Sequence, residues 1–168
     1  MNPVWCIRTG RLDMAPVWGG DLPDLIALKT DPSVFAVMLG GVRTREQVEA
    51  ELAADISMWG RLGVGMWSLR ARDDGQFIGI AGMMERRDGL GIALRFALWP
   101  QARGGGLARE ATVAALFFAH DRANIHRIVA VAREENFASR IVLGSIGMRV
   151  CGSFLRDGYT MLIYESVR

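Results

Sequence analysis

The pattern of hydrophobic and polar positions along the chain predicts an alternation of helices and strands. Helical spacing or capping signals mark four expected helices: Asp21–Thr30, Arg45–Arg61, Leu107–Arg122 and Asn136–Ile146. Two-residue alternation or β-branched runs mark seven expected strands: Arg11–Pro16, Gly65–Arg72, Gln76–Met84, Ile92–Trp99, Arg127–Arg133, Met148–Leu155 and Tyr159–Val167. We therefore expect a mixed α/β fold, with a mostly antiparallel sheet of about seven strands and helices on both faces.

Two of these segments carry more detailed expectations. Thr44 and Gln47 form a capping box, and Val48, Leu52, Ile56 and Trp59 follow at helical spacing, so these four are expected in the core. The helix from Leu107 connects the strand before it to the strand at Arg127–Arg133. Such a connection is typical of two parallel strands in a βαβ unit.

A glycine-rich loop joins the strand that ends at Trp99 to the long helix. Gly104, Gly105 and Gly106 can adopt positive φ, and they leave backbone N–H groups unscreened. Together with the helix N-terminus these groups suit a phosphate or pyrophosphate, although a tight turn without a ligand has the same pattern. No Lys-Ser or Lys-Thr follows, which excludes the nucleoside-triphosphate loop, and Arg109 stands where a dinucleotide loop needs its third glycine.

Composition narrows the class of protein without naming a ligand. The 168 residues are about half hydrophobic, with a formal net charge of +2, which is typical of a single globular domain spanning 1–168. The scattered arginines give no basis for nucleic-acid binding, and no apolar run is long enough to cross a membrane. Cys6 and Cys151 form no motif and are expected to remain thiols. With no secretory leader, the expected compartment is the cytoplasm.

Several motifs resemble the GNAT superfamily of N-acetyltransferases. The spacing Gln101-x-x-Gly104-x-Gly106 followed by Leu107-Ala108 resembles its acyl-CoA pyrophosphate loop. Four further segments resemble its RimJ/RimL-type branch: Arg11–Pro16 (R-L-x-L-R-P), Thr30–Val34 (S-D-P-x-V), Phe77–Gly82 (I-G-x-x-G) and Asn136–Met148 (N-x-x-S before G-F). The order and spacing of these motifs extend the resemblance to nearly the whole chain.

The resemblance implies a cofactor, acetyl-CoA, and a set of residues that bind it. The strands Ile92–Trp99 and Arg127–Arg133 would splay apart, and the pantetheine arm would pair with the main chain of Phe96, Ala97 and Leu98. Asn136 and Ser139 would face the arm and the sulfur. Pyrophosphate would bind the backbone N–H groups of the loop that follows Gln101, at Arg103, Gly104, Gly105, Gly106, Leu107 and Ala108.

The chemistry implied is direct attack of an amine on the thioester, without a metal or a covalent enzyme intermediate. Two family residues are missing: a strand glutamate is absent from Ala93–Phe96, and Leu143 stands where many members have a tyrosine acid. Ser139 is then a candidate to hydrogen-bond the departing sulfur, although helical serines also bond their own backbone. Glu85 is a second catalytic candidate, or else a solvated turn charge.

Two classes of function remain open at this point. One is an N-acetyltransferase for a primary amine, either a protein N-terminus or a small molecule. The other is a non-catalytic acyl-CoA-binding module on the same scaffold. The apolar segment Phe35–Leu39 either forms a wall of the acceptor cleft or belongs to the core. A homodimer is expected, because GNAT relatives are frequently dimers and half of this chain is hydrophobic.

Overall fold

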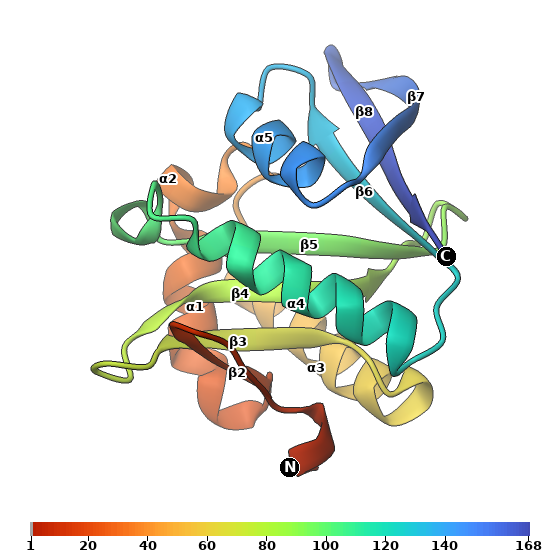
Figure 1. Cartoon of the computed structure of the whole chain (residues 1–168). Coiled ribbons are helices and arrows are strands. Elements are labelled where there is room, and N and C mark those ends of the chain that lie inside the picture. The colour runs from red at the N-terminus through yellow and green to blue at the C-terminus, as the bar shows by residue number, and fades with distance from the viewer. Residues whose placement is uncertain (1) are drawn as a thin grey trace.

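The structure is a computed structural model that describes residues 2–168. Eight strands form one sheet (Figure 1): β1 (Ile7–Arg8), β2 (Leu12–Pro16), β3 (Met66–Ala71), β4 (Phe77–Glu85), β5 (Ile92–Leu98), β6 (Arg127–Arg133), β7 (Arg149–Arg156) and β8 (Tyr159–Val167). The helices are α1 (Leu22–Thr30), α2 (Pro32–Phe35), α3 (Arg45–Leu62), α4 (Leu107–Asp121) and α5 (Phe137–Ser145). The mixed α/β fold is confirmed, and the sequence pattern missed only the short β1 and α2.

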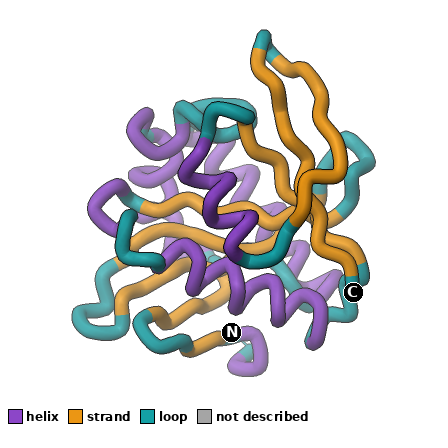
Figure 2. Tube along the Cα trace, turned by 45° about the horizontal axis from the view of Figure 1, so that its top comes forward, coloured by secondary structure: helices purple, strands orange, loops and turns teal. Residues whose placement is uncertain are grey.

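The sheet has the order β1-β2-β3-β4-β5-β6-β8-β7, and every neighbouring pair is antiparallel except β5 and β6. The parallel arrangement of these two strands is therefore confirmed. Helices α4 and α5 lie on one face of the sheet, and α1 and α3 lie on the other (Figures 1 and 2). This layering gives each face of the sheet its own hydrophobic core.

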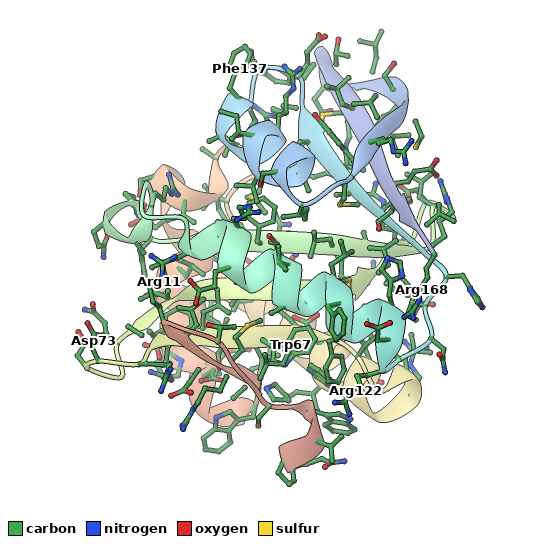
Figure 3. The ribbon with its side chains drawn as sticks, viewed as in Figure 1. Arg11, Trp67, Asp73, Arg122, Phe137 and Arg168 are labelled. Atoms are coloured by element: carbon green, nitrogen blue, oxygen red, sulfur yellow. The ribbon has the colours of Figure 1, made fainter. Side chains whose placement is uncertain are left out.

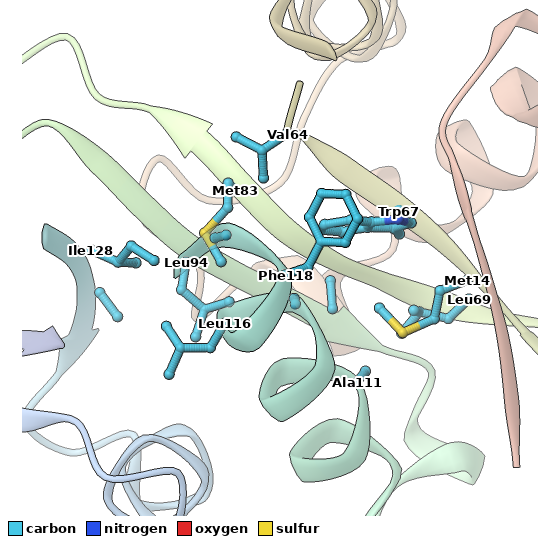
Figure 4. Close-up of a cluster of buried hydrophobic side chains, with 14 of the residues drawn as sticks. Met14, Val64, Trp67, Leu69, Met83, Leu94, Ala111, Leu116, Phe118 and Ile128 are labelled. Atoms are coloured by element: carbon cyan, nitrogen blue, oxygen red, sulfur yellow. The ribbon is translucent and has the colours of Figure 1, made fainter. Parts of the chain in front are cut away.

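The larger core lies between the sheet and α4 (Figure 4). Trp67 on β3 meets Trp59 of α3 and Phe118 of α4 edge-on, with ring centroids 4.7 and 5.3 Å apart. These tilted contacts are the favoured geometry for aromatic pairs and close one end of the core. The smaller core, under α1, α2 and α3, includes Leu28 and Phe35, which are both fully buried.

One predicted core position on α3 is wrong. Val48, Leu52 and Trp59 are buried as expected, but Ile56 is 43% exposed. At 3.6 residues per turn, Ile56 lies about 80° around the helix from Val48, whereas Asp55 lies only about 20° away. Asp55 therefore takes the inward position, and a carboxylate enters a region where the apolar spacing predicted a methyl-bearing side chain.

Strands β5 and β6 touch at one place and diverge from there. β4 pairs with β5 from Gly79–Leu98 to Glu85–Ile92, and β6 pairs with β8 along its whole length. Between β5 and β6 the single paired position is Ala93 with Val129. Beyond Ala93, β5 consequently has no strand pairing with β6, although the Leu98 carbonyl accepts a hydrogen bond from the Arg103 guanidinium at 3.0 Å. Figure 1 shows the two strands separating below α5.

Candidate active site

The glycine-rich loop folds as two tight turns before α4 begins. The N–H groups of Ala102 and Arg103 bond back to the carbonyls of Trp99 and Pro100, which turns the chain sharply after β5. Gly104 and Gly106 then adopt φ of +82° and +81°. Residues with a Cβ rarely occupy this region, so glycine is required at both positions for this backbone path.

The loop and the start of α4 present a run of unpaired backbone donors. Glu110 is the first residue of the helix whose N–H bonds back, to the carbonyl of Gly106. Within residues 2–168, the N–H groups of residues 104–109 have no acceptor. Consecutive free N–H groups at a helix N-terminus form an anion-binding nest that the helix dipole reinforces. The free N–H groups have the geometry that a phosphate seat requires, and phosphate binding at them stays a prediction.

Arg11, immediately before β2, holds this loop in place. Its guanidinium donates to the carbonyl of Gly105 at 2.7 Å and to the Glu110 carboxylate at 2.7 Å, and Thr9 donates to the same carboxylate at 2.6 Å. Figure 3 shows Arg11 beside the N-terminal end of α4. Because a trans peptide directs C=O and N–H oppositely, the bond at Gly105 turns the next N–H, that of Gly106, away from Arg11.

The pKa of Glu110 reflects the same contacts. Burial alone would raise it, but the bonds from Thr9 and Arg11 favour the carboxylate and lower the pKa below its usual value. Glu110 therefore stays ionised at neutral pH and keeps Arg11 aligned with the loop. No sequence pattern predicts this contact, because Arg11 and Glu110 are 99 residues apart.

A cavity of about 390 Å³ opens beside the nest, between the loop, β5, α5 and the turn after α2. Most of the predicted cofactor residues line it: Phe96, Ala97, Leu98, Arg103, Gly104, Gly106, Leu107, Ala108, Asn136 and Ser139. Gln101 and Gly105 do not line it. Gln101 is exposed on the short turn that precedes the glycines, and the Gly105 carbonyl is held by Arg11.

A second, narrower cavity of about 100 Å³ lies where β5 and β6 diverge, and it shares Phe96, Asn136 and Ser139 with the first. The Asn136 side chain caps α5 by accepting the N–H of Ser139 at 3.2 Å. The Ser139 hydroxyl has no hydrogen-bond partner among the described residues, whereas Ser145 on the same helix bonds the Val142 carbonyl. A half-buried hydroxyl donor is thus left open at the point that joins the two cavities.

A third cavity of about 660 Å³ lies on the opposite face of the sheet, between α3 and strands β4 and β5. It shares four residues with the second: Arg43, Met84, Arg86 and Arg95. The three cavities therefore follow one another, from the nest, through the gap between β5 and β6, to the face covered by α3. Such a sequence of cavities suits two molecules that meet in the middle.

Glu85, the second catalytic candidate, stands away from this meeting point. It faces Ile92 across the β4–β5 pair and forms a 2.8 Å ion pair with Arg61, with both side chains half exposed. Phe96 lies four residues further along β5, which corresponds to about 13 Å. Glu85 lines the third cavity but not the two that contain Ser139, so the structure does not bring the two candidates together.

Charged side chains meet at the inner wall of the third cavity. Glu51 pairs with Lys29 at 2.7 Å and with Arg43 at 2.5 Å, and it lies 3.5 Å from Arg95. Burial would raise the pKa of Glu51, but Arg95 and Lys29 lower it to about 2. Asp55 is different, because burial outweighs the same two cations and raises its pKa to about 6.

Sequence reasoning missed part of this wall. Arg95 lies on β5, the strand from which the glutamate common in this family branch is missing. The sequence pattern identified only that this glutamate was missing. Within the segment Phe35–Leu39, Phe35 is fully buried in the core, while Val37, Met38 and Leu39 line the first two cavities and not the third. That the segment forms a wall of the acceptor cleft stays a prediction. A charged residue in the middle of an otherwise apolar strand was the signal that could have marked Arg95.

Comparison with protein families decides the classification. Residues 11–149 match the family model described as an acetyltransferase (GNAT) domain. The chain belongs to the GNAT acetyltransferase family. It is accordingly an acetyl-CoA-dependent acyltransferase, and the expected resemblance is confirmed.

Solved structures of this family have the same fold. A putative GnaT-family acetyltransferase from Bordetella pertussis is 25% identical, with a TM-score of 0.84 over 95% of this chain and 98% of that one. An acetyltransferase from Agrobacterium tumefaciens is 24% identical, with a TM-score of 0.85 over 97% and 94%. RimL, a ribosomal alpha-N-protein acetyltransferase solved in complex with coenzyme A, is 16% identical, with a TM-score of 0.78 over 96% and 97%.

Residues 2–168 contain neither a metal-binding cluster nor a membrane-spanning helix. No three His, Cys, Asp or Glu side chains in this range are grouped so that they could hold a metal ion. No helix in the same range combines the length and the apolar character needed to cross a bilayer. Neither cysteine forms a disulfide, and both are exposed.

We expect Gly104→Ala to weaken acetyl-CoA binding by about tenfold or more, or at least 1.4 kcal/mol. A Cβ at φ +82° is strained, so the loop would shift and its N–H groups would no longer converge. Calorimetric titration of the folded variant measures the affinity. Gly105→Ala is the matched control, since Gly105 lacks positive φ and does not line the cavity. Equal affinities for the two variants would contradict the nest.

Proposed function

We propose that this GNAT enzyme transfers the acetyl group of acetyl-CoA to a primary amine that attacks the thioester directly. The observation that carries the proposal is the line of cavities with an anion nest at one end and the open Ser139 hydroxyl at the narrow middle. Acetyl-CoA enters from the nest, and the amine enters from the face covered by α3. The two meet where β5 and β6 diverge.

The cofactor is held mainly by backbone groups. The N–H groups from Gly104 to Ala108 bind the pyrophosphate, whereas the Arg103 N–H, predicted to do so as well, is already bonded to the Pro100 carbonyl. Gln101 supports the turn before them without touching the ligand. The unpaired edge of β5, at Phe96, Ala97 and Leu98, pairs with the amides of the pantetheine arm as an added strand would. Asn136 and Ser139 then face the end of the arm that carries the thioester.

The reaction forms a C–N bond and breaks the C–S bond of the thioester. The neutral amine attacks the carbonyl carbon, the CoA thiolate leaves, and the nitrogen loses its proton. Because thiols titrate near ~8.5, the leaving thiolate needs only modest stabilisation, which one hydrogen bond from Ser139 supplies. Glu85 remains a candidate acceptor for the amine proton, and at about 13 Å along the strand it acts through ordered water.

Family membership favours this enzyme over the non-catalytic acyl-CoA-binding module. Among the solved structures of the same fold, RimL is an alpha-N-protein acetyltransferase, which supports a protein N-terminus as one acceptor class. A small-molecule amine is the other class. The wide third cavity, open between α3 and β4, accommodates either.

The experiment that tests the function is a panel of acceptors. Purified protein is incubated with acetyl-CoA and with peptide N-termini, polyamines or amino acids, and acceptor-dependent release of free CoA is followed. Mass spectrometry of the acceptor confirms the acetylated product. If acetyl-CoA binds but no amine becomes acetylated, the binding-module alternative replaces the enzyme.

Ser139→Ala is expected to lower kcat by about ten- to a hundredfold, at or below the low end of general-acid effects. The affinity for acetyl-CoA should change little, because the bond to sulfur strengthens as the thiolate forms. Steady-state kinetics with an accepted amine and direct cofactor binding measure the two quantities. Ser145→Ala is the control, because that hydroxyl is already bonded to a carbonyl. An unchanged kcat would leave water as the proton donor.

We also propose that the protein is cytoplasmic and forms a homodimer. Two exposed cysteines outside any disulfide are in keeping with a reducing compartment. Exposed apolar side chains on α4, Val113 at 44% and Phe117 at 64%, are in keeping with a contact between subunits. Light scattering at micromolar concentration measures the molar mass, and a monomer would remove the dimer from the proposal.

A further inference from the structure

Arg95 lies at the junction between the meeting point and the cavity on the α3 face. It is next to Phe96 on β5, and it lines both the 100 Å³ and the 660 Å³ cavities. Its side chain is only 11% exposed. A molecule that reaches from the wide cavity toward Ser139 therefore passes along this guanidinium.

The guanidinium of Arg95 is incompletely satisfied. Its Nη2 is the one buried side-chain nitrogen or oxygen among the described residues that has no hydrogen-bond partner. Its Nη1 donates a long hydrogen bond to the Met84 sulfur at 4.0 Å and forms a long ion pair with a Glu51 oxygen at 3.5 Å. An unpaired buried donor on a charged group is costly, so a missing acceptor is indicated at this position.

The neighbouring carboxylate of Glu51 is already engaged elsewhere. Glu51 makes its short contacts with Lys29 and Arg43, at 2.7 and 2.5 Å. Three cations, Lys29, Arg43 and Arg95, thus share two carboxylates, those of Glu51 and Asp55. The Phe35 ring lies under both guanidinium groups, 5.3 Å from Arg95 and 5.6 Å from Arg43, and compensates part of the excess positive charge.

A carboxylate is the group that fits this site. The planar fork of an arginine matches two carboxylate oxygens, and such a pair gains strength away from water. The wall of the third cavity near Arg95 has an excess of positive charge, which disfavours polyamines and other acceptors that carry further cations. A third negative group would therefore have to come from the acceptor itself.

We propose that the acceptor is an amine that also bears a carboxylate, and that Arg95 binds this carboxylate while the amine reaches the thioester beside Phe96 and Ser139. The inference rests on the proposed acetyl transfer and specifies its substrate class. A free amino acid meets the requirement through its own carboxylate, and a peptide N-terminus meets it through an acidic first side chain. The shared chemistry is the amine with a nearby carboxylate.

The test uses acetylated products, so that it does not depend on turnover. The full chain loaded with CoA is titrated with N-acetyl amino acids and with the matching N-acetyl carboxamides, which differ only in the carboxylate. We expect the acids to bind at least tenfold more tightly than their amides. N-acetyl-aspartate amide against N-acetyl-asparagine amide forms a second arm, which separates a side-chain carboxylate from the main-chain one.

Substitutions assign the preference to Arg95. Arg95→Met keeps the length of the side chain without its charge and should equalise acid and amide, while Arg95→Lys keeps the charge and should retain part of the preference. Arg87→Met is the matched control, because Arg87 is an exposed arginine that lines the same wide cavity. The control should keep the full preference. Thermal unfolding of each variant confirms that it is folded, and Arg95→Lys carries the test if Arg95→Met does not fold.

Each remaining outcome is decisive. Equal binding of acid and amide by the unmodified protein, no binding of either, or a full preference in Arg95→Met overturns the carboxylate site. Acetyl transfer to amines that lack a carboxylate, at the same rate as to amines that bear one, also overturns the carboxylate site but leaves the proposed function intact. A carboxylate preference that depends on Arg95, in a protein that acetylates no amine, would support the carboxylate site and overturn the proposed function.

Discussion

The divergence of β5 and β6 is the constraint on which the rest of the site depends. Two parallel neighbours in a sheet normally hydrogen-bond along their length, but here Ala93 and Val129 form the single paired position. The backbone of β5 beyond that position must find its partners elsewhere, because an unpaired strand edge inside a fold is costly. The same divergence creates the narrow cavity that links the two faces of the sheet.

The two ends of this line of cavities differ in the kind of donor that they offer to a ligand. At the loop, the donors are main-chain N–H groups, so recognition there depends on backbone path and hardly on which side chains are present. On the α3 face, the donors are guanidinium and ammonium groups whose charges are only partly balanced. This difference suits a site that binds one constant cofactor at the loop and a variable acceptor on the α3 face.

The sequence predicted the parts of the molecule that depend on local pattern. Strand boundaries, the parallel βαβ connection and the glycine loop follow from spacing and from the special backbone freedom of glycine at Gly104 and Gly106. What it missed depends on contacts between distant segments. Asp55 lies inward where Ile56 was expected, and the cations that act on it, Lys29 and Arg95, come from α1 and β5, which the side-chain period along α3 does not reveal.

Two further misses have the same origin. Gln101 stands at the right spacing in the motif, but the short turn Pro100–Ala102 directs it away from the cavity, and turn geometry is not visible in spacing. Arg95 could be identified only as a missing glutamate, because the partly buried carboxylates near it come from α3, more than thirty residues earlier. Its significance depends on a charge balance that exists only in the folded chain.

The tie between Arg11 and Gly105 makes the cofactor seat a product of long-range assembly. The two residues are separated by 94 positions, so the orientation of the Gly106 N–H is set only after β2 has docked beside the start of α4. Contacts of such separation carry a large loop-closure cost and belong to the slow, non-local part of folding. Affinity for the cofactor therefore also depends on whether the first strands of the chain have reached their native position.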